Sequence, residues 1–135
     1  MKNKKIFLTL VVSSALLGLG GFWYNLSFSS QIKLPKEIDL KTIRLTDKPI
    51  FTVNIQNFTN STVEIPRVYT SCGCTTVLEP TNGTSLKPNA SKDIKVQFDP
   101  SSMHKNGDDV YHEIYILTSK PTEKEYVVKM KGKIL

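Results

Sequence analysis

The residues best suited to chemistry are two cysteines, Cys72 and Cys74, in the motif Thr-Ser-Cys-Gly-Cys-Thr-Thr. In an extended strand, residues i and i+2 point to the same side about 6.6 Å apart, near the upper limit for a disulfide. A bridge between these cysteines therefore needs a turn, which Gly73 permits. Because the ring would be small, we expect it to be strained and easily reduced.

Three interpretations of the pair stay open. The cysteines could be two small apolar side chains, or a local bridge, at the end of a strand. They could form a dithiol that exchanges electrons, or two thiolates that bind a soft metal such as copper or zinc. A metal site needs further ligands, and the candidates are Met103, His104 and His112, although their spacing matches no standard zinc signature.

The two histidines also have ordinary structural interpretations. His112 shares the phase of its apolar strand neighbours, where a lone histidine is more often hydrogen-bonded and partly buried than a ligand. Met103 and His104 are typical of a loop. Asp108 and the aspartate after it supply too few oxygens for a calcium loop and indicate a solvated turn. The sequence thus predicts no resident cofactor apart from the copper or zinc alternative.

Sequence signatures of enzymes are missing from the chain. It contains no Gly-x-Ser-x-Gly motif, no His-Glu-x-x-His motif and no glycine-rich phosphate loop. Neither histidine has a neighbouring nucleophile other than the distant thiols. We therefore expect no catalytic residues and predict that the protein is not an enzyme.

The N-terminal segment predicts a membrane location. Three lysines precede an uncharged run that starts at Ile6 and is densest in apolar residues up to Tyr24. A helix over this run would be about 28 Å long, close to the hydrocarbon core of about 30 Å. The alternative is a cleaved signal peptide, but no good cleavage site follows the run. We expect an uncleaved single-pass anchor.

The expected organisation follows from this anchor. Residues 1–24 form a transmembrane helix, residues 25–36 a polar tether, and residues 37–135 one domain. Because the lysines precede the span, the positive-inside rule places the N-terminus in the cytoplasm and the domain outside it, in the periplasm or at the cell surface. The expected partners are the membrane, through this helix, and an envelope protein.

Charge argues against a nucleic-acid partner. The chain has 18 Lys and Arg against 12 Asp and Glu, a net charge of +6. Without the three N-terminal lysines, 15 basic residues face 12 acidic ones, and the remaining +3 is spread along the chain without a basic run. Nucleic-acid binding is therefore not expected.

The domain shows the period-two alternation of half-buried β-strands. Apolar residues alternate with polar ones in residues 50–56, 94–98 and 126–130, and Ile134 continues the inward phase of the last run. Four further strands are expected at residues 38–45, 63–69, 75–78 and 110–117, the last apolar on both faces and therefore central. About seven short strands separated by Asn, Gly and Pro turns predict an antiparallel immunoglobulin-like β-sandwich.

Two details refine this prediction. The only tryptophan, Trp23, lies in the membrane segment and the cysteines are close together, so the sandwich is not of the antibody type. In residues 38–45 the apolar phase slips at Lys41 and Thr42. This slip predicts a bulge at which the strand changes sheet.

With its strands and cysteines placed, the chain resembles the DUF1573 family of small bacterial envelope proteins. The resemblance covers residues 37–134 and is carried most specifically by Ser-Cys-Gly-Cys-Thr at residues 71–75, together with Phe-Thr-Val-Asn-Ile-Gln-Asn at 51–57 and Ile-Lys-Val-Gln-Phe-Asp at 94–99. It implies a sandwich similar to Hydin-type and PapD-type domains and an extracytoplasmic location. It implies no activity.

Together these features predict a membrane-anchored accessory or interaction module of the cell envelope. The alternative is a thiol redox or copper-handling protein that uses Cys72 and Cys74. An interaction role would use a sheet edge or the long loops at residues 78–92 and 100–109.

Overall fold

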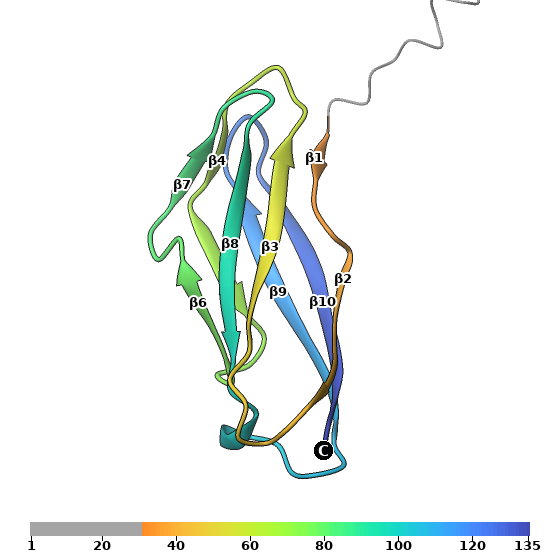
Figure 1. Ribbon diagram of the computed structural model, residues 1–135. Coiled ribbons are helices and arrows are strands. Elements are labelled where there is room, and N and C mark those ends of the chain that lie inside the picture. The colour runs from red at the N-terminus through yellow and green to blue at the C-terminus, as the bar shows by residue number, and fades with distance from the viewer. Residues whose placement is uncertain (1–30) are drawn as a thin grey trace, which may run out of the picture.

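The computed structural model describes residues 31–135, which form two packed β-sheets and a small two-stranded sheet. Figure 1 shows an elongated sandwich. Its elements are β1 (Ile32–Lys33), β2 (Glu37–Ile43), β3 (Ile50–Asn57), β4 (Val63–Ile65), β5 (Arg67–Thr70), β6 (Thr75–Glu79), β7 (Thr84–Leu86), β8 (Ser91–Phe98), the 3₁₀ turn η1 (Pro100–Ser102), β9 (Asp109–Thr118) and β10 (Lys124–Ile134).

Strands β6 and β5 are edge strands of the two large sheets and lie next to each other. One sheet has the order β1-β3-β8-β6 and the other β2-β10-β9-β5, while β4 pairs with β7. The predicted all-β sandwich is confirmed, although the sheets are not purely antiparallel because β2 runs parallel to β10. The other named strand pairs within residues 31–135 are antiparallel.

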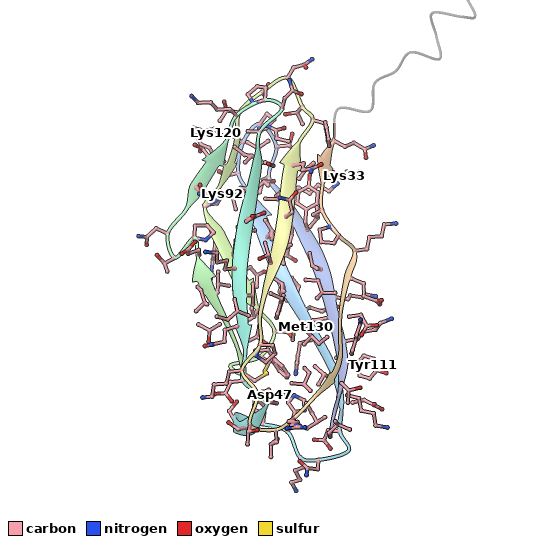
Figure 2. All side chains as sticks on the ribbon, viewed as in Figure 1. Lys33, Asp47, Lys92, Tyr111, Lys120 and Met130 are labelled. Atoms are coloured by element: carbon pink, nitrogen blue, oxygen red, sulfur yellow. A yellow bond between two sulfur atoms is a disulfide. The ribbon has the colours of Figure 1, made fainter. Side chains whose placement is uncertain are left out.

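The predicted inward phase of the main strands is confirmed. Eight of the apolar residues predicted to point inward are at most 1% exposed, while Phe51 and Tyr126 are partly buried; the eight are Val53, Ile55, Ile94, Val96, Phe98, Val128, Met130 and Ile134. In Figure 2, Met130 lies between the sheets while Tyr111, which is 75% exposed, projects outward. The strand expected to be central, β9, lies between β10 and β5.

The predicted bulge in β2 is present, but the predicted change of sheet there is wrong. Lys41 has a positive φ of 56°, and the register with β10 shifts beside it, between Lys131 and Lys133. β2 nevertheless pairs with β10 on both sides of the bulge. The chain changes sheet earlier, between β1, which pairs with β3, and β2. Pro35 lies at this point, and its missing N–H interrupts a ladder.

Two expected segment boundaries differ from the structure. The predicted strand at residues 63–69 is divided at Pro66 into β4, which pairs with β7, and β5, which pairs with β9. Because β7 occupies residues 84–86, the region expected to be one long loop at residues 78–92 contains a strand. β7 is short and lacks a clear alternation, which explains why the pattern missed it.

The N-terminal expectations fall mostly outside the described residues. The predicted anchor, residues 1–24, lies outside them altogether. Part of the predicted tether belongs to the fold, because Ile32 and Lys33 pair with Asn57 and Gln56 of β3. Within residues 31–135, no helix has the length and apolar character needed to cross a membrane.

The core consists of two clusters stacked along the sandwich. One packs around Ile55, Ile94 and Ile116, and the other around Phe98, Val110 and Met130 with Cys74 at its border. The second cluster lies at the end of the sandwich that carries η1, opposite to the end where β1 begins (Figure 1). The cysteine pair therefore lies far from the start of the described chain.

Candidate functional site

The motif Cys72-Gly73-Cys74 forms a tight turn between β5 and β6, and its two sulfur atoms are joined in a disulfide. The Cα atoms of the two cysteines are 5.2 Å apart, closer than an extended strand allows. The backbone N–H of Cys74 donates to the Cys72 sulfur at 2.9 Å, and that of Thr75 donates to the Cys72 carbonyl at 3.2 Å. The turn predicted from the spacing is thus present.

Neighbouring residues hold this turn in place from both sides. The Thr70 hydroxyl donates to the Thr75 carbonyl at 2.8 Å and lies 3.0 Å from the Cys72 carbonyl. The backbone N–H of Ser71 donates to the Glu113 carbonyl at 2.9 Å, and the backbone N–H of Glu113 donates to the Ser71 hydroxyl at 2.9 Å. The two hydrogen bonds to Glu113 therefore hold the cysteine turn against β9.

Gly73 does not have the steric role that the sequence suggested. A Cβ atom at this position would meet no heavy atom within 4 Å, and its φ lies outside the left-handed region. The turn therefore does not require glycine. Because glycine has no side chain, the space beside the disulfide stays open.

The two sulfur atoms differ in accessibility. Cys74 is 2% exposed and packs against the core cluster around Phe98, whereas Cys72 is only partly buried. Cys72 also lines an open groove of about 540 Å³ between β5 and β6. A reagent in solvent therefore reaches Cys72 first.

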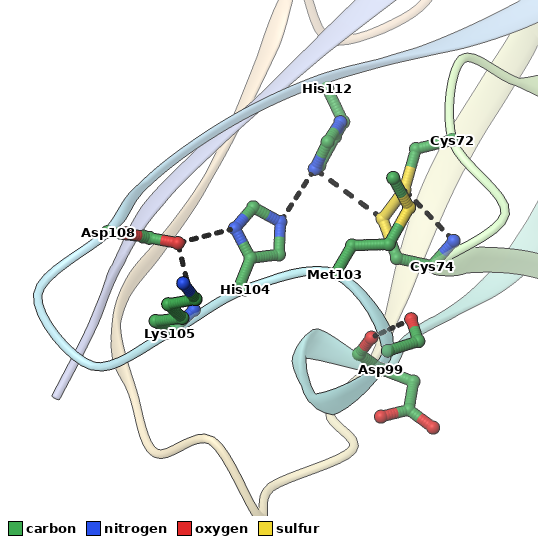
Figure 3. A network of polar contacts seen from close by, with 9 residues as sticks. Cys72, Cys74, Asp99, Met103, His104, Lys105, Asp108 and His112 are labelled. Atoms are coloured by element: carbon green, nitrogen blue, oxygen red, sulfur yellow. Dashed lines mark hydrogen bonds and ion pairs between the residues drawn. A yellow bond between two sulfur atoms is a disulfide. The ribbon is translucent and has the colours of Figure 1, made fainter.

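One histidine lies directly beside the buried sulfur, and a second histidine contacts the first (Figure 3). His112 points inward from β9, and its Nε2 is 3.5 Å from the Cys74 Sγ. The Nε2 atom of His104, from the loop after η1, is 3.0 Å from the Nε2 of His112. The Phe98 ring packs against both imidazoles, with centroid distances of 5.7 and 6.0 Å, and forms the apolar wall of the site.

The short turn η1 positions the loop residues. Asp99 caps it by accepting from the Ser101 backbone N–H at 3.2 Å, and the backbone N–H of His104 donates to the Pro100 carbonyl at 2.9 Å. This turn places the Met103 sulfur 3.7 Å from the Cys72 Sγ. Met103 is 66% exposed, so the thioether covers the disulfide from the solvent side.

The surroundings of His112 disfavour its protonated form. Burial, and secondarily the nearby His104, lower the pKa of His112 below its usual range. On the far side of His104, its Nδ1 is 3.7 Å from the Asp108 carboxylate, which also accepts from the Lys105 backbone N–H.

The structure therefore brings together all five site residues considered from the sequence: Cys72, Cys74, Met103, His104 and His112. Of these, Cys72, Cys74 and His112 form a group whose possible ligand atoms lie within 4.8 Å of one another. His112 is partly buried and hydrogen-bonded, as its phase predicted.

Sequence reasoning missed two contributors. Asp108, interpreted as part of a solvated turn, faces the His104 ring, and Phe98, recognised only as core, forms the wall of the site. The sequence signal available for Asp108 was its spacing of four residues from His104 across an Asn-Gly turn. No local pattern indicates that Phe98 lies at the site.

Comparisons with known proteins agree with this fold. The model of the family described as "Protein of unknown function (DUF1573)" matches residues 32–134. A comparison with curated proteins found no match. A solved protein of unknown function from Porphyromonas gingivalis W83 aligns with a TM-score of 0.64 and 16% identity over 82% of this chain and 50% of that one.

Two further solved structures have the same architecture. The YadV chaperone aligns with a TM-score of 0.62 and 13% identity over 76% of this chain and 51% of that one. The ASH/PapD-like domain of human CEP192 aligns with a TM-score of 0.56 and 10% identity over 79% of this chain and 87% of that one. The chain thus spans about half the length of the first two structures, and at these identities the likeness shows the fold alone.

Proposed function

Because the chain belongs to the DUF1573 family of proteins of unknown function, we propose a role from its site: an accessory module of the bacterial cell envelope that binds a partner protein beside a reversible cysteine pair. The likeness to PapD-like and chaperone domains supports an interaction role. The observation that carries the proposal is that partly buried Cys72 opens onto a groove bounded by the edge strands β5 and β6.

We further propose that residues 1–24 anchor the module in the cytoplasmic membrane and that the sandwich lies outside the cytoplasm. The lysines followed by an uncharged apolar run support this placement. An extracytoplasmic location is also where a disulfide persists. Since the cysteine site lies at the end of the sandwich opposite to β1, it would face away from the membrane (Figure 1).

The groove suits an extended partner segment. Edge strands offer unpaired backbone N–H and C=O groups, to which a segment of another protein can add as a further strand. β5 and β6 offer such edges on the two sheets, and Thr76 on β6 is exposed along the groove. A segment bound there would bring its own side chains next to the Cys72 sulfur.

The cysteine pair would then exchange electrons with a partner dithiol. A partner thiolate attacks the accessible Cys72 Sγ, the disulfide breaks, and Cys74 leaves with the electron pair as a thiolate 3.5 Å from the His112 Nε2, which can donate a hydrogen bond to it. The second partner thiolate attacks the mixed disulfide and releases Cys72. The partner is oxidised by two electrons to a disulfide, and the protons released by its thiols go to Cys72 and Cys74.

Single-cysteine variants of the full-length chain in detergent test this chemistry. With Cys74→Ala only the accessible thiol remains, and with Cys72→Ala only the buried one. We expect oxidised glutathione to form a mixed disulfide with Cys72 at least about tenfold faster than with Cys74, measured by mass spectrometry. Equal rates, or a wild-type disulfide that glutathione does not open in the folded protein, would exclude the exchange role.

Site-specific crosslinking in intact cells tests the interaction role. A photoreactive residue at Thr76, in the groove, should capture a defined envelope protein. The same residue at Lys129, which is exposed on the interior strand β10 of the other sheet, serves as the matched control. Identical adducts from both positions, or none from Thr76, would remove the groove as the binding surface.

A further inference from the structure

We propose that the reduced form of this site binds one monovalent copper ion through four donors, namely the thiolates of Cys72 and Cys74, the imidazole of His112 and the thioether of Met103. This inference rests on the proposed reducibility of the cysteine pair. It adds a second chemistry to the same residues, available only when the disulfide is open.

The distances between the side-chain atoms carry this inference. In a tetrahedral site with metal–nitrogen bonds of about 2.05 Å and metal–sulfur bonds of about 2.3 Å, ligand atoms lie about 3.3 Å apart for two nitrogens, about 3.6 Å for sulfur and nitrogen, and about 3.8 Å for two sulfurs. The observed separations are 3.5 Å between the Cys74 Sγ and the His112 Nε2 and 3.7 Å between the Cys72 Sγ and the Met103 Sδ, and the possible ligand atoms of Cys72, Cys74 and His112 all lie within 4.8 Å of one another.

These donor atoms come from three separate parts of the chain. The cysteines lie in the turn between β5 and β6, Met103 lies in the loop after η1, and His112 lies on β9 (Figure 3). While the site is oxidised, the His112 Nε2 is 3.0 Å from the His104 Nε2, with which it can share a hydrogen bond. Binding of an ion by the His112 Nε2 would replace that hydrogen bond.

The set of donor atoms selects copper(I) over other ions. Thiolate and thioether sulfurs are soft ligands that favour copper(I), whereas hard oxygen donors favour magnesium, calcium and manganese. Two thiolates and an imidazole could also bind zinc, but structural zinc sites do not use a methionine. The position of Met103 next to Cys72 therefore distinguishes the two metals.

Access and support for an ion are both present. Met103 is 66% exposed and Cys72 is partly buried, so an ion or a donor protein can approach from solvent. Cys74 and Phe98 close the inner side of the site.

Loading of the site takes two steps. An external dithiol reduces the disulfide, becoming a disulfide itself and leaving two cysteine thiols. Binding of one copper(I) ion then displaces the two thiol protons to solvent. Exchange with a partner disulfide, which takes up the two electrons and becomes a dithiol, would close the bridge again, remove both thiolates and release the ion.

The test is anaerobic competition for copper(I) between the full-length chain in detergent and a chromogenic copper(I) chelator. After reduction with a phosphine, we expect one ion per chain, bound at least about 100-fold more tightly than by the oxidised chain or by the Cys72→Ala/Cys74→Ala double variant. We expect His112→Ala and Met103→Leu each to weaken binding by about tenfold or more. Lys105→Ala, on the same loop, should not change it.

The outcomes separate the two proposals. If the disulfide is not reduced in the folded protein, both proposals are wrong. If glutathione exchange occurs but the reduced chain binds copper(I) no better than the double variant, the copper inference alone is overturned. Preferential binding of zinc, with no loss in Met103→Leu, would likewise overturn the assignment to copper. X-ray absorption that shows copper bonded to both sulfur and imidazole nitrogen would support it.

Discussion

His104 and His112 face each other through their Nε2 atoms at 3.0 Å, although one lies in the loop after η1 and the other in the middle of β9. The contact joins the loop to the strand next to the Cys74 sulfur. As a result, the loop that carries Met103 is held over the disulfide from the solvent side.

The first prediction concerns the titration of His112. Burial and the nearby His104 lower its pKa, so the unfolded chain binds more protons than the folded one just below the ordinary value of about 6.5. The contribution of His112 to the free energy of unfolding is therefore complete above about pH 6.5 and falls as the pH drops through the folded-state pKa. Thermal unfolding from about pH 8 to about pH 5 should show this loss, and His112→Gln should reduce it.

NMR titration of the imidazole provides the matching control. Because burial is the larger cause, the pKa of His112 should stay below its ordinary value in His104→Asn, although less so than in the wild type. A normal pKa in the wild type would contradict the burial of this ring.

The second prediction concerns the inner wall of the site. Phe98 is fully buried on β8, and Phe98→Ala should lower the free energy of unfolding by about 3 to 5 kcal/mol. Lys92→Ala, an exposed position on the same strand, should change it by no more than about 0.5 kcal/mol. Chemical denaturation measures both free energies of unfolding. Similar losses for the two variants would refute the assigned phase of β8.

The third prediction compares two glycines in loops. Gly73→Ala should leave stability within about 0.5 kcal/mol, since an added Cβ meets nothing within 4 Å. Gly107→Ala should cost about 1 to 2 kcal/mol, because its φ of +92° is one that side-chain-bearing residues rarely adopt. Denaturant midpoints measure both. Equal costs would show that the turn at Gly73 depends on glycine after all.

The fourth prediction concerns the structural contribution of the disulfide. Because the cysteines are separated by two positions, the closed loop is small, and Cys72→Ala/Cys74→Ala should lower the free energy of unfolding by about 2 to 3 kcal/mol at most. The variant should retain a native circular dichroism spectrum. Unfolding of the domain on removal of the pair would identify the bridge as essential to the fold and would favour the purely structural interpretation.

Much of the fold follows from local pattern. The alternation of Val53 with Ile55, and of Ile94 with Val96, assigns β3 and β8 to the sandwich and gives their inward faces. Local pattern does not show which strands pair with each other. The parallel alignment of β2 with β10, and the passage from β1 to β2 across Pro35, depend on which strands meet in space.

The site shows the same division. The site residues could be identified as candidates from their chemistry, since cysteine, methionine and histidine side chains bind metals and cysteine takes part in redox reactions. Their convergence could not be predicted, because Cys74 and His112 are 38 positions apart and meet only through the pairing of β5 with β9. The sequence alone indicates only a solvated turn at Asp108, because its contact with His104 depends on that convergence.

Equilibration with glutathione tests the central claim, a reversible cysteine pair on an immunoglobulin-like module, most directly. The full-length chain in detergent is incubated in mixtures of reduced and oxidised glutathione, quenched by alkylation and weighed by mass spectrometry, with circular dichroism recorded in parallel. We expect the fraction of reduced Cys72 and Cys74 to follow the glutathione ratio while the domain stays folded. A pair that stays fully oxidised in reduced glutathione, or is reduced only as the domain unfolds, would contradict the account.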